Sequence, residues 1–248
     1  MKRDLVFKKK KIFLIIFALF LFTTGLFIIK HIFCLKNAPI RILLCGFEPF
    51  GSYNYNSSWE TIKSYAENAN IKGKMEILKL PVSYARAAKL LEKKIDEFNP
   101  DIIIAFGMGN PNIVKEPIVL HPIAVNFDDA QIPDNDGILK LEELIRKDGP
   151  IAFWSTLPLT AIKRELLSNG ILCRIFNFGG NYLSNHIFYE LMYISSHRKS
   201  IKMAGFIHIS PYNENFSYQD SVRAVAIIVN VCLQSVNQNN NWLPGYSR

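Results

Sequence analysis

Compact apolar runs alternate with amphipathic stretches along most of this chain, and this alternation constrains the fold more than any other feature. The apolar runs have the length and the isoleucine, leucine and valine content of buried strands: Ile40–Cys45, Glu76–Pro81, Asp101–Phe106, Ile118–Asn126, Ile171–Asn177 and Met203–Ile209. The amphipathic stretches have helical periodicity: Ser57–Asn68, Tyr84–Phe98, Leu159–Asn169, Asn181–Ser195 and Tyr218–Val236. Strands separated by helices predict a three-layer α/β/α sandwich with a mostly parallel sheet. Ser57, with Glu60 three residues later, is predicted to cap the first helix, and Gly170 to end the third.

The positive charge of the chain is concentrated at its N-terminus. The 248 residues carry a formal net charge of +8, and the segment through Lys36 supplies +7 of it, from eight basic residues and one acidic residue. The remainder is nearly neutral. The charge therefore gives no reason to expect a nucleic-acid partner, because such a partner requires a basic face on the folded domain.

An uncharged apolar run follows this basic start. The 18 residues from Ile12 to Ile29 carry no charge and as a helix would span roughly 27 Å, close to the hydrocarbon thickness of a bilayer. We therefore predict an N-terminal transmembrane helix as a single-pass membrane anchor. By the positive-inside rule, the N-terminus is then cytoplasmic and the globular domain extracytoplasmic. The alternative is a cleaved signal peptide, which Thr23–Gly25 favours and the continued apolar run disfavours.

These features divide the chain into five segments. Residues 1–11 form a basic cytoplasmic segment, 12–33 the anchor, 34–39 a linker, 40–236 one globular domain and 237–248 a polar tail. No cofactor or metal is expected, because the four cysteines lack paired metal-ligand spacing and the chain has no G-x-x-x-x-G-K loop for phosphate.

Two segments contain the residue types that nucleophilic hydrolases use. Asn177–Tyr189 is a glycine turn that leads into an amphipathic helix with Ser184 near its start, and Ala204–Ile209 is an apolar strand that carries His208. A hydroxyl near a helix N-terminus, beside an imidazole at the end of a neighbouring strand, matches the nucleophile and the base of such enzymes.

Eight short motifs, taken in order, resemble the pyroglutamyl peptidase I family of cysteine peptidases, which remove an N-terminal pyroglutamate from peptides. They are G-F-E-P-F-G (Gly46–Gly51), N-S-S-W-E (Asn56–Glu60), L-P-V (Leu80–Val82), P-D-I-I-I (Pro100–Ile104), A-V-N-F-D-D-A-Q-I-P-D-N-D-G (Ala124–Gly137), D-G-P-I-A-F-W-S-T-L-P (Asp148–Pro158) and the two segments above. The resemblance covers roughly residues 40 to 232 and implies the family's fold, with a peptide or small-amide ligand. It leaves a homo-oligomer open.

The family works through a Glu–Cys–His triad, and two of the three positions differ in this chain. Ser184 stands at the position of the cysteine, and His208, 24 residues later, at that of the histidine. The position of the glutamate falls on His121. A hydroxyl must lose its proton during attack, and a histidine supports a charged base less well than a carboxylate does. We therefore predict lost or reduced peptidase activity.

An active hydrolase is the alternative interpretation. It would release N-terminal pyroglutamate or cleave a related small amide or ester, with Ser184 as nucleophile and His208 as base. Glu116 lies in a loop that departs from the family's pattern in length and content. In this alternative Glu116, and not His121, is the third member of the triad and supplies its acidic side chain.

The substrate pocket implied by the resemblance is better retained than the triad. Phe47 and Phe50 hold the positions of two phenylalanines that sandwich the pyrrolidone ring in the family. Asn56 holds that of an asparagine that fixes this loop. Tyr182 and Leu183 replace bulky apolar neighbours of the nucleophile, so a small, flat, neutral amide is the expected ligand.

Overall fold

The computed structural model describes residues 22, 24, 39–69, 74–110, 112, 115–177, 179, 180 and 182–238. The predicted basic segment, anchor and linker lie outside these residues, except for Phe22, Thr24 and Pro39, and so does the predicted polar tail from residue 239. Among the helices that are described, none combines the length and the apolar character needed to cross a bilayer.

Six strands form the central sheet, and most of them are parallel. Their spatial order is β2 (Lys74–Leu80), β1 (Arg41–Phe47), β3 (Ile102–Met108), β8 (Met203–Ile209), β4 (Ile118–His121) and β7 (Cys173–Ile175). The first four pair in parallel, whereas β4 runs antiparallel to β8 and parallel to β7. The predicted α/β fold with a mostly parallel sheet is confirmed, with one strand pairing reversed.

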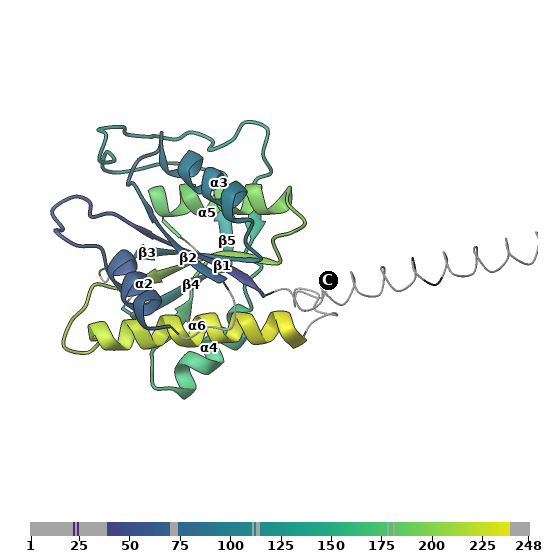
Figure 1. Ribbon diagram of the computed structural model, residues 1–248. Helices are drawn as coiled ribbons and strands as arrows, with labels where there is room; N and C mark the ends of the chain where they lie inside the picture. The colour runs from purple at the N-terminus through teal and green to yellow at the C-terminus, as the bar shows by residue number, and fades with distance from the viewer. Residues whose placement is uncertain are drawn as a thin grey trace, which may run out of the picture. The chain divides into compact units, whose positions relative to one another are not determined.

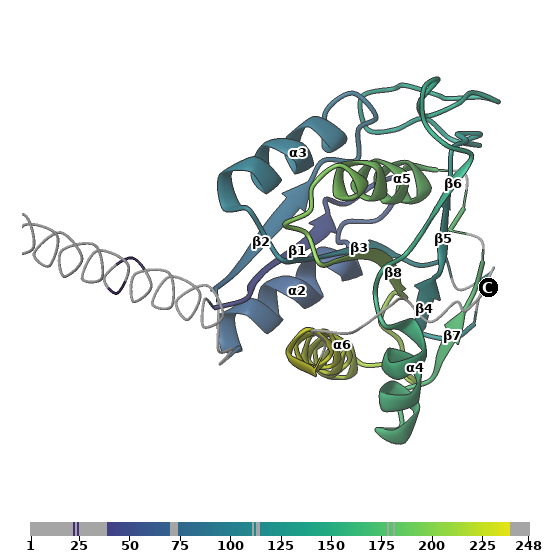
Figure 2. The ribbon, with the colours of Figure 1, turned by 90° about the vertical axis from the view of Figure 1, so that its right-hand side faces the viewer.

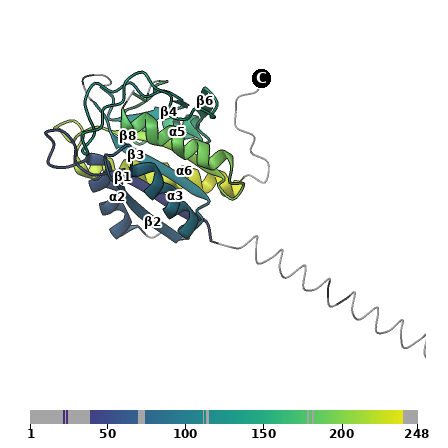
Figure 3. The same ribbon diagram turned by 90° about the horizontal axis from the view of Figure 1, so that it is seen from above.

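Helices cover both faces of this sheet, which gives the three layers visible in Figure 1. One face carries α2 (Ser57–Asn68), α4 (Leu159–Ser168) and α6 (Tyr218–Gln238), and the other carries α3 (Ala87–Phe98) and α5 (Leu183–Ser196), as Figure 2 shows from a further side. Figure 3 shows α3 and α5 from above. Alternate residues of β1 point to opposite faces, so Ile42 and Leu44 belong to one hydrophobic core and Leu43 and Cys45 to the other. Both faces of the sheet are buried, which explains the continuous apolar strands of the sequence.

The predicted strand Ile118–Asn126 is in fact two strands in different sheets. Pro122 separates β4 from β5 (Ile123–Val125), and β5 pairs antiparallel with β6 (Ala152–Trp154) in a two-stranded sheet. Proline has no N–H to donate to a sheet, and here its carbonyl accepts a bond from Ser155 at the end of β6. β6 has only three residues, too few for its pattern to be predicted.

The cap of α2 lies one residue earlier than predicted. Asn56 is the N-cap, and its side chain accepts the backbone N–H of Ser58, whereas the Ser57 hydroxyl donates to the carbonyl of Ile209 at the end of β8. Gly170 follows the end of α4 with a φ of 75°, as a glycine beyond a helix C-terminus often does.

The long segment between Val125 and Ala152 contains no helix and no regular strand, and α5 holds it through four buried side chains. Asn185 bonds Val125 and Phe127, and His186 bonds Asp128 at 2.7 Å. Further along α5, Tyr189 bonds the carbonyl of Pro150 and Glu190 pairs with Arg146. The helix that carries Ser184 at its start is thereby fixed along its length.

Candidate active site

A cavity of about 380 Å³ lies where the parallel strands end. The residues around it come from the ends of β3, β4 and β8, from the loops after β1 and β7, and from the start of α5. Ser184, His121 and His208 all line it. The structure therefore brings together the three residues that the sequence assigned to the triad, at the sheet edge where α/β proteins bind ligands.

Ser184 is the second residue of α5, and its position follows from the glycines before it. Gly180 has a φ of 89°, a left-handed conformation that glycine adopts readily, and the chain turns there into the helix. The first backbone bond of α5 is donated by Asn185 to the carbonyl of Tyr182. The N–H of Ser184 has no hydrogen-bond partner among the described residues and lies at the electropositive end of the helix.

His208 lies on β8 with its ring toward Ser184. Its Nε2 atom is 3.0 Å from the Ser184 hydroxyl oxygen. Gly107 is its partner on β3, and a Cβ atom built on that glycine would come within 2.9 Å of the imidazole. The ring occupies this place because the neighbouring strand has no side chain there.

His121, at the end of β4, is the third member of the group. It is 2 % exposed, and its Nε2 atom is 2.8 Å from Nδ1 of His208. Its Nδ1 atom is 3.0 Å from the carbonyl oxygen of Phe176, which follows β7. Because β4 is antiparallel to β8, His121 faces Phe206 across the pair and stands diagonally to His208 on the same face.

The partners of these nitrogens permit one arrangement of protons when both rings are neutral. A carbonyl only accepts, so Nδ1 of His121 carries a proton and its Nε2 accepts one from Nδ1 of His208. Nε2 of His208 is then unprotonated and accepts the hydroxyl proton of Ser184. This is the protonation state that a general base requires.

Burial keeps both imidazoles neutral. Loss of solvation lowers the pKa of His121 to about 4, against the opposing effect of its bond to Phe176. The pKa of His208 is lowered well below its usual value, first by desolvation and then by the neighbouring His121. At neutral pH the base is therefore free of its proton, but it is also weak.

Comparisons with known proteins identify the family of this chain. The family model described as pyroglutamyl peptidase matches residues 40–237. The chain belongs to the pyroglutamyl peptidase family. A pyrrolidone-carboxylate peptidase from Bacillus cytotoxicus is 33% identical over 202 residues, which are 78% of this chain and 93% of that protein. One from Fusobacterium nucleatum is 36% identical over 172 residues, 69% of this chain and 78% of the relative.

Solved structures of pyroglutamyl peptidases are also similar to this chain. Pyrrolidone carboxyl peptidase from the hyperthermophile Pyrococcus furiosus superimposes with a TM-score of 0.75 at 33% identity, and covers 79% of this chain and 100% of its own. Pyroglutamyl peptidase I from Bacillus amyloliquefaciens gives 0.73 at 31% identity, with 78% and 95% covered.

The predicted pocket residues of this family member are placed in two groups. Phe50 and Tyr182 line the cavity, with ring centroids 6.0 Å apart. Phe47 is 4 % exposed and packs on Phe206 in the core, and Leu183 is buried in the same cluster. Neither Phe47 nor Leu183 is among the described residues that line the cavity. Of the two predicted phenylalanines, Phe50 therefore lines the cavity with Tyr182, and Phe47 lies in the core.

The structure also shows what Asn56 and Glu116 contact or influence. The amide of Asn56 donates to the carbonyl of Glu48, which holds the loop that carries Phe50. Glu116 precedes β4 and acts electrostatically on Cys173, which pairs with the first residue of that strand. His121 lies at the last residue of β4, so the partner of His208 Nδ1 is His121 and not Glu116.

Several residues of the site were not predicted from the sequence. The carbonyl of Phe176 orients His121, and no side-chain pattern reveals a main-chain acceptor. Gly107 makes room for His208, and its position at the end of an apolar strand was a usable signal. Ser210 also lines the cavity, and its place two residues after His208 predicts that it shares the same face.

Proposed function

We propose that this family member is a hydrolase that releases N-terminal pyroglutamate from peptides, or cleaves a closely related small amide, with Ser184 as its nucleophile and a low turnover rate. The observation that carries the proposal is the unbroken hydrogen-bonded series from Ser184 through His208 and His121 to Phe176. The names of the relatives supply the substrate class. The aromatic cavity wall formed by Phe50 and Tyr182 fits a flat, neutral ring.

The proposed reaction is an acyl transfer in two steps. The Ser184 oxygen attacks the carbonyl carbon of the scissile bond, its proton passes to Nε2 of His208, and the oxyanion forms near the backbone N–H of Ser184 at the start of α5. His208 then gives the proton to the leaving amine, and the C–N bond breaks to leave an ester on Ser184. Water, deprotonated by His208, hydrolyses the ester and restores the hydroxyl.

His121 explains why we expect a low rate. When His208 takes the proton it becomes a cation, and a neutral imidazole stabilises that cation less than a carboxylate does. The lowered pKa of His208 also makes it a weak base. The same two observations favour a second candidate function, in which the cavity binds a pyroglutamyl ligand without turnover.

Turnover of a chromogenic pyroglutamyl amide by the purified full-length chain separates the two candidates. We expect slow hydrolysis that falls by about 100-fold or more in both Ser184→Ala and His208→Ala, because the two residues act as one unit. Ser184→Cys should be faster than the parent, because a thiolate needs less assistance from the base. If neither the parent nor Ser184→Cys hydrolyses the amide, the proposed hydrolysis is wrong and the second candidate, ligand binding without turnover, replaces it.

We further propose that the protein is held in the membrane by residues 12–33, with the globular domain outside the cytoplasm. The support is the uncharged run from Ile12 to Ile29 behind a basic cluster.

A further inference from the structure

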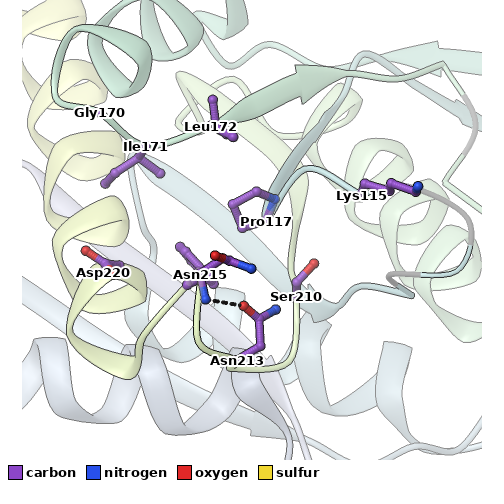
Figure 4. A pocket seen from close by; sticks show the side chains of 10 residues that line it. Lys115, Pro117, Gly170, Ile171, Leu172, Ser210, Asn213, Asn215 and Asp220 are labelled. Atoms are coloured by element: carbon purple, nitrogen blue, oxygen red, sulfur yellow. Dashed lines mark hydrogen bonds between the residues drawn. The ribbon is translucent and has the colours of Figure 1, made fainter.

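A second cavity, of about 280 Å³, lies beside the first and has no part in the reaction described above. Its walls come from segments far apart in the sequence: Lys115, Pro117, Gly170, Ile171, Leu172, Ser210, Asn213, Asn215, Phe216 and Asp220. Figure 4 shows Ile171, Leu172 and Pro117 on one side of it and Asn213 on the other, with the Ser210 hydroxyl to one side.

The second cavity adjoins the active site at Ser210, which lines both. Ser210 follows β8 directly, and its N–H bonds the carbonyl of Pro117, just before β4. Phe50 follows β1, which lies two places away from β8 in the sheet, and the second cavity lies toward β4 and β7. The aromatic wall and the second cavity therefore stand on opposite sides of β8.

The spacing suits a peptide that extends across His208. Residues two apart on a strand share a face and are separated by roughly 7 Å, which places Ser210 that far beyond the base. An extended peptide covers about 3.3–3.6 Å per residue, so one or two residues after the scissile bond reach the second cavity. If the pyrrolidone ring of the proposed substrate lies against Phe50, a peptide extended past His208 would carry its leaving part toward the second cavity.

The walls of the second cavity combine an apolar patch, polar side chains and the basic side chain of Lys115. Leu172 is 64 % exposed beside the buried Ile171 and Phe216. Asn213 Oδ1 accepts the N–H of Asn215, and the side-chain amide of Asn215 has no partner among the described residues. Asp220 is the acidic group here, and its carboxylate accepts bonds from Ser217 and Arg223.

We propose that the second cavity is the binding site for the one or two residues that follow pyroglutamate, and that Leu172 selects an apolar side chain there. The inference rests on the proposed function for the direction of the substrate. It names the class of peptide that the site prefers, which the cavity next to Ser184 alone does not determine.

Calorimetric binding to the full-length Ser184→Ala variant tests this without turnover. The ligands are pyroglutamyl-leucyl-leucinamide, pyroglutamyl-glycyl-glycinamide and pyroglutamamide, which lacks everything after the scissile bond. We expect the leucyl peptide to bind about fivefold or more tightly than the glycyl peptide, because it buries apolar surface on Leu172. Leu172→Asp should abolish that difference and leave the affinity for pyroglutamamide unchanged.

Leu167→Asp is the matched control, because it adds the same charge at an exposed leucine. Leu167 lies on α4 and is not among the residues that line the second cavity. Equal binding of the two peptides, or equal effects of Leu172→Asp and Leu167→Asp, would overturn the inference and leave the proposed function intact. Binding of none of the three ligands would overturn both. If the parent shows no turnover but Ser184→Ala binds the leucyl peptide more tightly than the glycyl peptide, only the proposed hydrolysis is overturned.

Discussion

At the scale of single residues, the Nδ1 atom of His121 and the carbonyl oxygen of Phe176 lie 3.0 Å apart, and this contact determines which nitrogen of the neutral His121 ring carries the proton. A carboxylate side chain at position 121 would meet the same carbonyl as a second acceptor, with no proton between them. A neutral imidazole satisfies both neighbours, because one nitrogen donates to Phe176 and the other accepts from His208. His121 therefore positions the base in a way that the sequence comparison alone did not suggest.

Two substitutions of His121 test this positioning role. His121→Phe removes the acceptor for Nδ1–H of His208, so we expect kcat to fall by about tenfold or more, with a smaller change in KM. His121→Gln keeps an acceptor for His208 and a donor for Phe176, and should retain most of the activity. Steady-state kinetics on the pyroglutamyl amide decide the matter, and equal losses in both variants would contradict the role.

The burial of His121 also predicts how stability depends on pH. Its pKa is about 4 in the folded protein and near 6.5 in an unfolded chain, so between these values the unfolded state binds the extra proton. The free energy of unfolding should therefore fall as pH decreases from 6.5 to 4, by on the order of 3 kcal/mol at most. Denaturant unfolding at pH 7.5 and 4.5 measures this, and His121→Gln should lose clearly less. An equal loss in that variant would assign the effect to other groups.

At the scale of elements, α5 has two roles at once. Its first turn carries Ser184, and its buried polar side chains hold the segment between β5 and β6. Asn185 accepts the N–H of Val125 and donates to two carbonyls, at distances of 2.9 to 3.0 Å, so it pairs with β5 much as another strand would. Ser184 therefore lies at the start of a helix that is bonded along its side to β5.

Removal of the Asn185 side chain should show how much this attachment contributes. Asn185 is 1 % exposed, and Asn185→Ala removes the side-chain partner of backbone groups of Val125 and Phe127 at partly buried hydrogen bonds. We expect a loss of about 2–3 kcal/mol in the free energy of unfolding. Asn169→Ala, at an exposed residue after α4, is the control and should change it by about 0.5 kcal/mol or less. Chemical denaturation of both variants gives the comparison, and similar small losses would show that Asn185 is not a structural attachment.

The accuracy of the sequence prediction differs among the elements for physical reasons. Ser57–Asn68 and Met203–Ile209 were predicted to the residue, because each has a strong period and clear ends. Ile118–Asn126 has the composition of one strand, yet Pro122 divides it between two sheets, because composition does not show where pairing partners change. β6 has only three residues, and Trp154 is 55 % exposed, so the strand does not show the alternation of buried and exposed residues that marks a strand in a sequence.

At the scale of the whole molecule, motif order located the site, but contacts across the fold determined its geometry. The sequence placed Ser184, His208 and His121 in one group, and the structure brings them together from α5, β8 and β4. The second cavity was not predicted, because it arises where β4 reverses direction beside β8, and strand direction is not written in the residues that line it.

The predicted anchor is a property of the full chain and can be tested apart from the folded domain. The compact unit that begins at Ile40 has its own cores, and the Pyrococcus furiosus relative is covered in full by 79% of this chain. We expect the full-length chain to sediment with membranes and to resist alkaline extraction, because a run of 18 uncharged and mostly apolar residues partitions into the bilayer. A chain that starts at Ile40 should stay in the supernatant with unchanged turnover.

A full-length variant with Phe17→Glu and Leu21→Glu is the sharper control, because it keeps the length of the segment and places two charges at its centre. It should be released by alkaline extraction. Protease added from outside the cell should digest the domain only if the positive-inside orientation is correct. A parent chain found in the soluble fraction with its N-terminus removed would establish the cleaved signal peptide instead, because the apolar run would then be absent from the mature protein.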